Sequence, residues 1–299
     1  MKPAPFTYHR PAEVDEAVRL LARLHDRDES AKVLAGGQSL VPLLSMRLAS
    51  PMHIVDVGAL PGLADVAVDR EGVSVGALVR HRGLERHEGA HAVLPLLRQA
   101  LLNVAHPTIR NRGTVVGSLC HADPSAEMPA VLALLGGALT VRSVRGERTV
   151  RADELFTGPL ETSLADDELA LAAHFPAPPP RTGTSVAEVA RRHGDYAVCG
   201  VVAAVTLDDT GLVTSARATY VSAGDTLAPV DLGQPVVGAT PAAADWRAAG
   251  ELARDGVATE DDLHASAAYR SQLVAVLTER ALREAAGRAG SRPRSGVAA

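Results

Sequence analysis

The spacing of apolar residues changes several times along the first sixty residues. From Pro11 to Leu24 apolar residues recur at near-helical spacing, which predicts an amphipathic helix. Short apolar runs at residues 31–35 and 53–57 predict strands, and residues 40–48 between them predict a short helix. This αβαβ order favours an α/β unit whose ligand-binding loop lies at the end of a strand.

Beyond residue 61 the apolar stretches become shorter. A helix is predicted around residues 91–104, and Asp123-Pro124 forms a helix-start signal ahead of the apolar run 126–135. We interpret this region as a second α/β unit. Residues 1–176 then form one domain with two subdomains, at about 1–60 and 61–176.

A proline-rich stretch at residues 175–184 marks the strongest candidate for a domain boundary, because it suits neither a helix nor a central strand. We therefore expect a linker at 177–185 and a second domain at 186–286. Residues 287–299 are rich in Gly, Arg, Ser and Ala and predict a flexible tail.

Within the second domain the pattern predicts strands first and a helix later. Apolar runs at residues 198–207 and 212–222 flank the turn Asp208-Asp209-Thr210-Gly211, which indicates a β-hairpin. Residues 261–286 have a helical pattern. The fold class expected for the whole chain is therefore α+β, with a small α+β domain at the C-terminal end.

Composition narrows the class of protein. Of the 299 residues 46% are hydrophobic, and the formal net charge is −5, which favours neither nucleic acid nor an anionic membrane as a partner. There is no run of about 18 apolar residues, and the proline-broken N-terminus is unlike a signal peptide. We therefore expect a cytoplasmic location.

The two cysteines, Cys120 and Cys199, lie far apart without a Cys-x-x-Cys neighbour. The chain therefore cannot build an iron–sulfur cluster or a structural zinc site from cysteine, and any cluster must belong to another chain. We interpret both as buried, inert thiols. Aromatic residues make up only 3% of the chain, so a flat cofactor would rest on aliphatic side chains and backbone.

Two adjacent glycines follow the first predicted strand, in Ala35-Gly36-Gly37-Gln38-Ser39. Glycines there would let backbone N–H groups turn toward one point, and the helix behind them would add its positive end. The loop therefore suits a phosphate or pyrophosphate and favours a nucleotide cofactor. A plain tight turn is the alternative.

A second loop, residues 113–127, combines glycines with small hydroxylated residues. Asp123 could accept hydrogen bonds from the sugar or ribityl hydroxyls of a ligand, or could simply cap a helix. Thr114 and Ser118 could approach a ligand or satisfy local backbone. We interpret His106 and His121 as loop histidines rather than metal ligands.

A third segment, residues 188–197, gathers Arg, His, Asp and Tyr near the domain boundary. It could line a cleft or form a solvated turn, and the residues alone leave this open. The motifs of Rossmann, P-loop, serine-hydrolase and zincin proteins are absent from the sequence. We therefore predict no catalytic residue and no metal ligand.

Taken together, these segments resemble the FAD-binding medium subunit of the molybdenum hydroxylases, the xanthine dehydrogenase and carbon monoxide dehydrogenase medium-subunit family. Ala35–Ser39 looks like the first pyrophosphate loop of that family, Thr114–Ser118 the second, and Arg191–Ala197 the signature of its C-terminal domain. The resemblance extends through His121–Pro124 and, elsewhere in the chain, Phe6–Pro11, Ile54–Val57, Tyr269-Arg270 and Glu279–Leu282.

The resemblance implies a two-subdomain α/β FAD-binding domain of the PCMH/VAO-like type. Two departures stand out: Val116 occupies a position that is often glycine in relatives, and Glu188 stands where many have lysine or an aromatic residue. The cofactor-binding residues that the resemblance implies are Leu34, Ala35, Gly36, Gly37, Gln38, Ser39, Leu40, Thr114, Val115, Gly117, Ser118, His121, Asp123 and Asp195.

By the same resemblance the chain is the FAD subunit of a heterotrimeric molybdenum hydroxylase, in a dimer of heterotrimers. A large molybdopterin-binding subunit would oxidise the substrate, and a small subunit with two [2Fe-2S] clusters would pass electrons to FAD and on to a final acceptor. Two alternatives remain. One is a stand-alone FAD-dependent oxidoreductase, and the other, which Val116 keeps open, is a binding or assembly subunit that holds FAD weakly.

Overall fold

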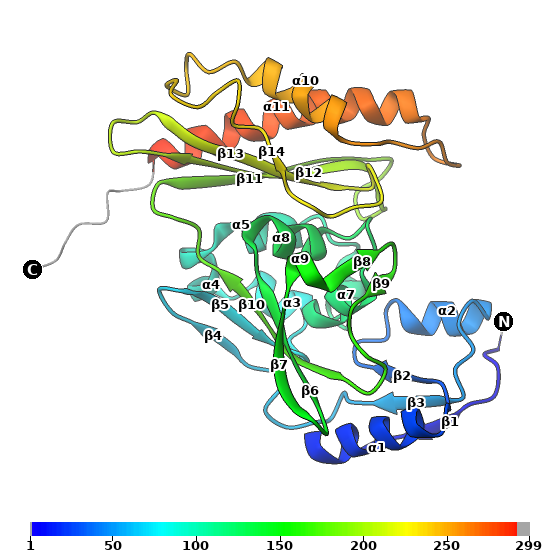
Figure 1. The fold of residues 1–299 in the computed structure, drawn as a ribbon. Coiled ribbons are helices and arrows are strands. Elements are labelled where there is room, and N and C mark those ends of the chain that lie inside the picture. The colour runs from blue at the N-terminus through cyan, green and yellow to red at the C-terminus, as the bar shows by residue number, and fades with distance from the viewer. Residues whose placement is uncertain (1, 292–299) are drawn as a thin grey trace, which may run out of the picture.

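The structure, a computed structural model, describes residues 2–291 and consists of three parts stacked along the long direction of Figure 1. A small N-terminal subdomain adjoins a second subdomain built on an antiparallel sheet, and a C-terminal sheet with two helices lies on top. Among residues 2–291, no helix has both the length and the apolar character needed to span a membrane.

The N-terminal subdomain is a parallel three-stranded sheet in the order β1-β3-β2. The two helices and two strands predicted from apolar spacing are confirmed within a few residues. Strand β1 was not predicted, because its three residues are mostly exposed and carry no apolar run. The elements are β1 (Thr7–His9), α1 (Val14–Asp26), β2 (Ala31–Leu34), α2 (Leu40–Met46) and β3 (His53–Asp56).

The second subdomain contains a five-stranded sheet in the order β4-β5-β10-β6-β7, with every neighbouring pair antiparallel. Helices lie between β5 and β6 in the chain. The elements are β4 (Val66–Val68), β5 (Gly72–Gly76), α3 (His81–Glu85), α4 (Glu88–Val93), α5 (Pro95–Leu101), α6 (Pro107–Arg110), α7 (Val115–His121), α8 (Glu127–Leu135), β6 (Ala138–Ser143), β7 (Gly146–Arg151), α9 (Ala152–Leu155), β8 (Phe156–Gly158), β9 (Glu161–Thr162) and β10 (Leu169–Pro176).

Two helix predictions in this subdomain need correction. The helix expected over residues 91–104 is broken into α4 and α5, because Leu94 precedes Pro95 and leaves the helical conformation, with φ −131° and ψ 77°. Helix α8 begins at Glu127 and has Ala126 as its N-cap, so Asp123 does not cap it. The Asp123 carboxylate instead accepts a hydrogen bond from the Ser125 N–H at 2.8 Å.

The two subdomains share one hydrophobic core. Helix α1 buries Ala17, Val18, Leu21 and Leu24, which lie at helical spacing on one side. These residues belong to the same cluster as the buried side of the antiparallel sheet and helices α5 and α8. The subdomains therefore form one folding unit around the loops between them.

The C-terminal domain is an antiparallel sheet in the order β11-β12-β13-β14 with two helices on one side. The hairpin predicted around residues 208–211 is confirmed as β12 and β13. The elements are β11 (Thr182–Ala190), β12 (Ala197–Leu207), β13 (Val213–Val221), β14 (Val230–Asp231), α10 (Trp246–Gly256) and α11 (Ala267–Ser291).

Strand β12 carries apolar residues on both of its sides, as expected for a strand of a sheet that is covered on both sides. Its odd-numbered residues, such as Val201 and Val205, pack toward α10 and α11. Its even-numbered residues, such as Val202, join the core of the two N-terminal subdomains, where β12 contacts α8. The C-terminal sheet thus packs against the rest of the chain through a buried apolar interface.

Three boundaries differ from those expected. Strand β11 begins at Thr182, inside the range proposed as a linker. Helix α11 starts at Ala267 rather than Asp261, because the Asp261 and Asp262 carboxylates accept backbone N–H groups in a loop. It continues to Ser291, so the tail predicted from residue 287 was wrong over residues 287–291, and 292–299 lie outside the described residues.

Candidate functional site

The two glycine loops singled out in the sequence lie against each other. A Cβ atom added to Gly36 would be 2.5 Å from the carbonyl oxygen of Arg112 and 2.8 Å from the Cα of Gly113. No side chain fits at such distances. The first loop can therefore approach the second only because residue 36 is glycine.

The first loop has the predicted strand–turn–helix geometry. Leu34 ends β2 and its carbonyl accepts the Val57 N–H at 3.0 Å, while Leu40 starts α2. Gly37 takes a φ of +74°, a conformation that side chains disfavour. The Gln38 side chain donates to the Gly36 carbonyl at 3.2 Å. Residues 34–40 are all half-buried, so the loop keeps accessible backbone.

The second loop starts helix α7. Thr114 is its N-cap, and the hydroxyl oxygen accepts the Gly117 N–H at 3.1 Å, so Thr114 satisfies local backbone. The Val115 N–H donates to the Val79 carbonyl at 3.1 Å, and this fixes the helix start beside β5. Gly117 and Ser118 remain half-exposed.

Val116, the departure from the family pattern, is 2% exposed and belongs to the hydrophobic core. Its side chain therefore does not lie on the accessible side of the loop where Gly117 and Ser118 are found. The substitution adds apolar packing beneath α7.

Residues of the C-terminal signature reach the second loop. Tyr196 is 69% exposed as a residue, but partial burial of its hydroxyl, followed by the charge of Asp123 and a side-chain hydrogen bond with it, raises the pKa of Tyr196 to about 12. The sequence did not single out Tyr196 as a site residue. The signal was its position next to Asp195, whose own N–H closes a turn onto the Arg192 carbonyl at 3.1 Å. His121 is the last residue of α7 and half-exposed.

Gly194 brings this signature into close contact with His106. Its φ is +90°, and a Cβ atom there would lie 2.4 Å from Nδ1 of His106. His106 is the N-cap of α6, in the same segment that supports Gly36 through Arg112 and Gly113. The first loop and the C-terminal signature thus both contact the segment of residues 106–114.

A buried arginine fixes that supporting segment. Arg110 is 4% exposed, and its Nε donates to Oε2 of Glu85 at 2.8 Å. One of its terminal nitrogens donates to the carbonyls of Val104 and Ala105, each at 2.7 Å. Nearby His81 packs against Gly113, and burial, followed by the Arg110 charge, lowers the pKa of His81 to about 4. His81 is therefore neutral at physiological pH.

Two glutamates, one from each side of the contact between the C-terminal domain and the rest of the chain, have carboxyl groups that are much weaker acids than usual. Burial, followed by the charge of Glu188, raises the pKa of Glu127 to about 8. Burial raises the pKa of Glu188 to about 7, and its Oε2 atom is buried without a hydrogen-bond partner. Glu188 therefore points into the protein and not into solvent.

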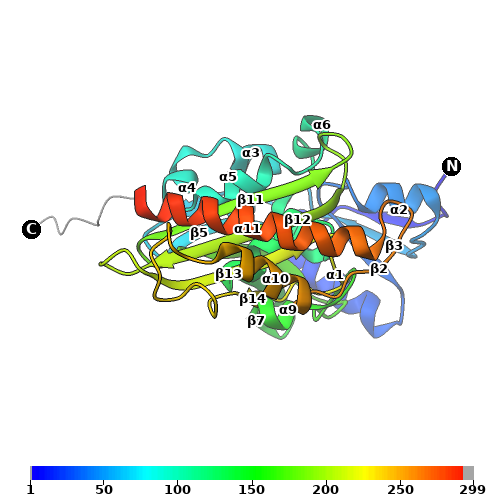
Figure 2. The ribbon, with the colours of Figure 1, turned by 90° about the horizontal axis from the view of Figure 1, so that it is seen from above.

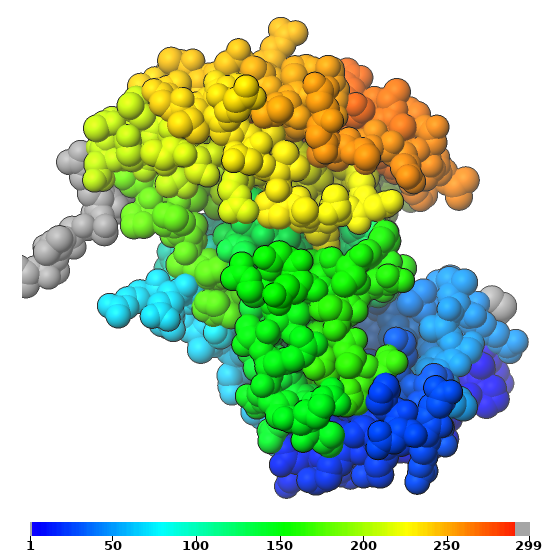
Figure 3. All heavy atoms as spheres, in the orientation of Figure 1, coloured from blue at the N-terminus to red at the C-terminus, as the bar shows by residue number. Residues whose placement is uncertain are grey.

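The arrangement suits a bound, phosphate-bearing cofactor more than catalysis by side chains. Figure 3 shows the molecular surface hollowed between the N-terminal subdomain and the C-terminal domain. Burial raises the pKa of Cys120 and of Cys199 to about 12, so both thiols are poor nucleophiles. Over the described part of the chain, no group of three His, Cys, Asp or Glu side chains is placed to hold a metal ion.

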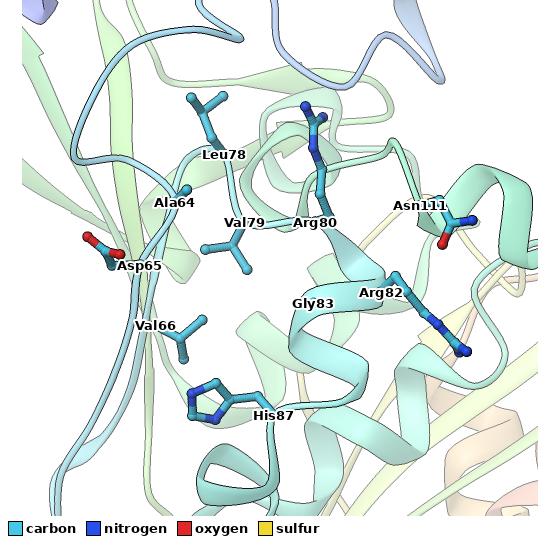
Figure 4. Close-up of a pocket in the computed structure, with 10 residues that line it drawn as sticks. All are labelled: Ala64, Asp65, Val66, Leu78, Val79, Arg80, Arg82, Gly83, His87 and Asn111. Atoms are coloured by element: carbon cyan, nitrogen blue, oxygen red, sulfur yellow. The ribbon is translucent and has the colours of Figure 1, made fainter.

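A separate open pocket of about 580 Å³ lies between β4 and α3 (Figure 4). None of the predicted cofactor residues lines it. Three of its polar side chains already serve local structure: Arg80 donates to the Arg112 carbonyl, Arg82 pairs with Glu85, and the His87 ring accepts the Ala90 N–H. We assign it no function.

Comparison with known proteins covers nearly the whole chain. Residues 4–178 match the family model described as the FAD binding domain in molybdopterin dehydrogenase, and residues 184–285 match the CO dehydrogenase flavoprotein C-terminal domain. The alpha subunit of the 6-hydroxypseudooxynicotine dehydrogenase complex of Paenarthrobacter nicotinovorans is 39% identical over 97% of each chain. The carbon monoxide dehydrogenase medium chain of Afipia carboxidovorans is 32% identical, covering 97% of this chain and 99% of that one.

Solved structures agree with the sequence comparison. A chain of quinoline 2-oxidoreductase from Pseudomonas putida 86 superposes with a TM-score of 0.88 at 33% identity, over 97% of this chain and 99% of that chain. A chain of reconstituted CO dehydrogenase from Oligotropha carboxidovorans gives a TM-score of 0.87 at 32% identity, over 96% and 100%.

Proposed function

Because this chain belongs to the family of FAD-binding medium subunits of the molybdenum hydroxylases, we propose that its two glycine loops hold FAD in the hollow beneath the C-terminal domain. The observation that carries this assignment is the contact of Gly36 with Arg112 and Gly113. It brings the first loop and the start of α7 together, so the N–H groups of the first loop and the positive end of α7 would serve one anionic group.

The binding residues act through backbone and small polar side chains. The N–H groups of Gly36–Ser39 would meet the pyrophosphate, and the half-exposed Ser118 would approach the phosphates and the flavin, while Thr114, 3% exposed, would hold the start of α7 in place. Asp123 would bind ribityl hydroxyls, since an ionised carboxylate can accept further hydrogen bonds beside those from Ser125 and Tyr196. We add Tyr196, which faces Asp123 from the C-terminal domain.

The chain acts as the flavoprotein subunit of an oxidoreductase complex. Bound FAD supplies the redox chemistry, while the protein positions it and sets its surroundings. Electrons come from the [2Fe-2S] clusters of a small partner, which a large molybdopterin-binding partner reduces, and leave to a final acceptor. We propose a cytoplasmic complex that is a dimer of such heterotrimers. Burial of Val116 gives no support to the alternative of weak FAD binding.

Gly36→Ala tests the site. The added methyl would push the Arg112 carbonyl away and separate the loops, so we expect the affinity for FAD to fall by about tenfold or more. Gly83→Ala is the matched control, because a Cβ there meets no atom within 4 Å. FAD content after purification and titration of apoprotein with FAD give the result, and circular dichroism checks folding. Equal FAD affinity in a folded Gly36→Ala protein and the control would refute the assignment.

Partner content distinguishes the complex from a stand-alone oxidoreductase. Native purification should yield the chain together with a molybdopterin-binding subunit and an iron–sulfur subunit. A flavin-containing protein that oxidises a small molecule without either partner would favour the stand-alone alternative.

A further inference from the structure

Arg80, the N-cap residue of α3, lies beside both glycine loops. Its backbone pairs with Thr114 in an isolated antiparallel bridge, which places it next to the start of α7. One of its terminal guanidinium nitrogens donates to the Arg112 carbonyl oxygen. A Cβ atom on Gly36 would be 2.5 Å from that same oxygen. The Arg80 guanidinium and the backbone of the first loop therefore both lie against one oxygen atom.

The Arg80 side chain has donors left for a further group. A guanidinium carries five N–H groups, and within residues 2–291 the Arg112 carbonyl is the only hydrogen-bond partner of this one. No carboxylate in that range forms an ion pair with Arg80, whereas Arg82 pairs with Glu85. Figure 4 shows the side chains of Arg80 and Arg82 extending in different directions. Arg80 is therefore a half-buried cation without a counter-charge in the described part of the chain.

The two loops of the proposed FAD site need a cation. Residues 36–39 and 114–118 contain no lysine or arginine, and Asp123 adds a negative charge nearby. The Arg112 carbonyl oxygen is the negative end of a peptide dipole, and it lies against Gly36, where the pyrophosphate is proposed to bind. Without a donor this oxygen would repel a phosphate. The Arg80 guanidinium removes that repulsion, and its remaining N–H groups can donate to phosphate oxygens.

We propose that Arg80 is a pyrophosphate-binding residue of the FAD site, whose guanidinium holds the Arg112 carbonyl and donates its other N–H groups to a phosphate oxygen. The inference rests on the proposed function, and it adds to the two backbone loops a charged side chain that neither loop contains. The planar guanidinium can serve the carbonyl and a phosphate together, because its donors point in several fixed directions. The site therefore favours a phosphate-bearing ligand over an uncharged one.

Titration of the apoprotein with FAD tests the role of Arg80. Arg80→Gln keeps an amide that can donate to the Arg112 carbonyl but removes the charge, so we expect the affinity for FAD to fall by about tenfold or more. Arg80→Lys keeps the charge and should lose less affinity than Arg80→Gln. Arg86→Gln is the matched control, because Arg86 is exposed at the other end of α3 and its loss changes the net charge equally. This control should bind FAD as the wild type does.

Salt and a smaller ligand separate binding of the phosphate from support of the loop. Screening should weaken FAD binding by the wild type as sodium chloride rises from about 50 mM to about 500 mM, and it should weaken binding less in Arg80→Gln. ADP carries a pyrophosphate without the flavin, so its affinity should fall in Arg80→Gln by about the same factor as that of FAD. Urea unfolding of each apoprotein checks that the variants are folded.

The outcomes distinguish this inference from the proposed function. If Arg80→Gln binds FAD as tightly as the wild type, or loses affinity with an unchanged salt dependence, the guanidinium does not bind the pyrophosphate while the FAD site stands. If the wild type binds ADP but no FAD, the proposed function fails, and the affinities for ADP alone decide the role of Arg80. Binding of neither ligand by the folded wild type refutes both.

Discussion

Two glycines decide how the parts of the candidate site meet. Gly36 admits the backbone of the second loop, and Gly194 admits the ring of His106. The sequence singled out Gly36 and Gly37 as a flexible pair, but the structure separates their roles. Gly37 provides the positive φ, whereas Gly36 provides the close approach. Both requirements exclude a Cβ atom, yet for different physical reasons.

Gly194→Ala tests the link between the C-terminal signature and the FAD-binding region. A side chain at positive φ costs about 1–2 kcal/mol, and here it also collides with His106. Gly211→Ala is a close control, because its φ of +89° nearly equals that of Gly194 while a Cβ there meets only Arg181 at 4.0 Å. Urea unfolding should show the strain of the positive φ in both variants and a larger loss of stability in Gly194→Ala, and only Gly194→Ala should weaken FAD binding in a titration.

If Gly211→Ala weakens FAD binding as much as Gly194→Ala, the contact with His106 does not support the site. If neither variant changes the affinity, the signature binds no part of the cofactor.

Arg110 is the buried residue whose removal should affect the site most. Arg110→Ala would leave Glu85, which is 7% exposed on its side chain, without its buried partner, and would free the carbonyls of Val104 and Ala105. Breaking a buried pair in this way costs about 3–5 kcal/mol. Arg82→Ala removes the more exposed partner of Glu85 and should cost about 1 kcal/mol or less. Chemical denaturation measures both, and equal losses would contradict the role given to Arg110.

At the level of elements, strong periodic patterns made reliable predictions and weak ones did not. Helix α1 and strands β2 and β3 followed from apolar spacing because each buries one continuous side. The end of α11 was missed because Gly287 and Gly290 suggested a tail. The helix persists there since Ala285 and Ala289 are fully buried against β11, a tertiary contact that no local pattern reveals.

Gly183 is the point on β11 where α11 makes this contact. A Cβ atom at Gly183 would lie 2.0 Å from the Ala285 carbonyl oxygen and 2.4 Å from the Ala289 nitrogen. Gly183→Ala should therefore lower the free energy of unfolding by about 1–3 kcal/mol, as overpacking does. Gly287→Ala, on the open side of the same helix, should raise it by about 0.5–1 kcal/mol. Thermal unfolding followed by circular dichroism measures both, and a stable Gly183→Ala protein would disprove the close contact.

For the whole molecule, the sequence identified the loops of the site but not the spatial contacts between them. The first and second loops and the C-terminal signature were recognised as motifs, and the fold that they implied agrees with the comparisons. The interaction of Tyr196 with Asp123 could not be predicted, because it depends on how the C-terminal sheet lies on α8. Such contacts arise from packing of β12 and β13, whose apolar patterns specify no particular partner.

The residues proposed to line the FAD cleft come from distant parts of the chain, so the ribosome synthesises them at different times. The first loop leaves the ribosome early, but the residue that closes the cleft opposite Asp123 is Tyr196, about two thirds of the way through the chain. Until β12 and β13 emerge, α8 has no sheet to cover it, and a nascent chain offers an open set of loops to the cofactor. We therefore expect FAD to be inserted only after β12 and β13 have been synthesised, and we expect a chain that stalls within β11 to expose the apolar residues of α8 to chaperones.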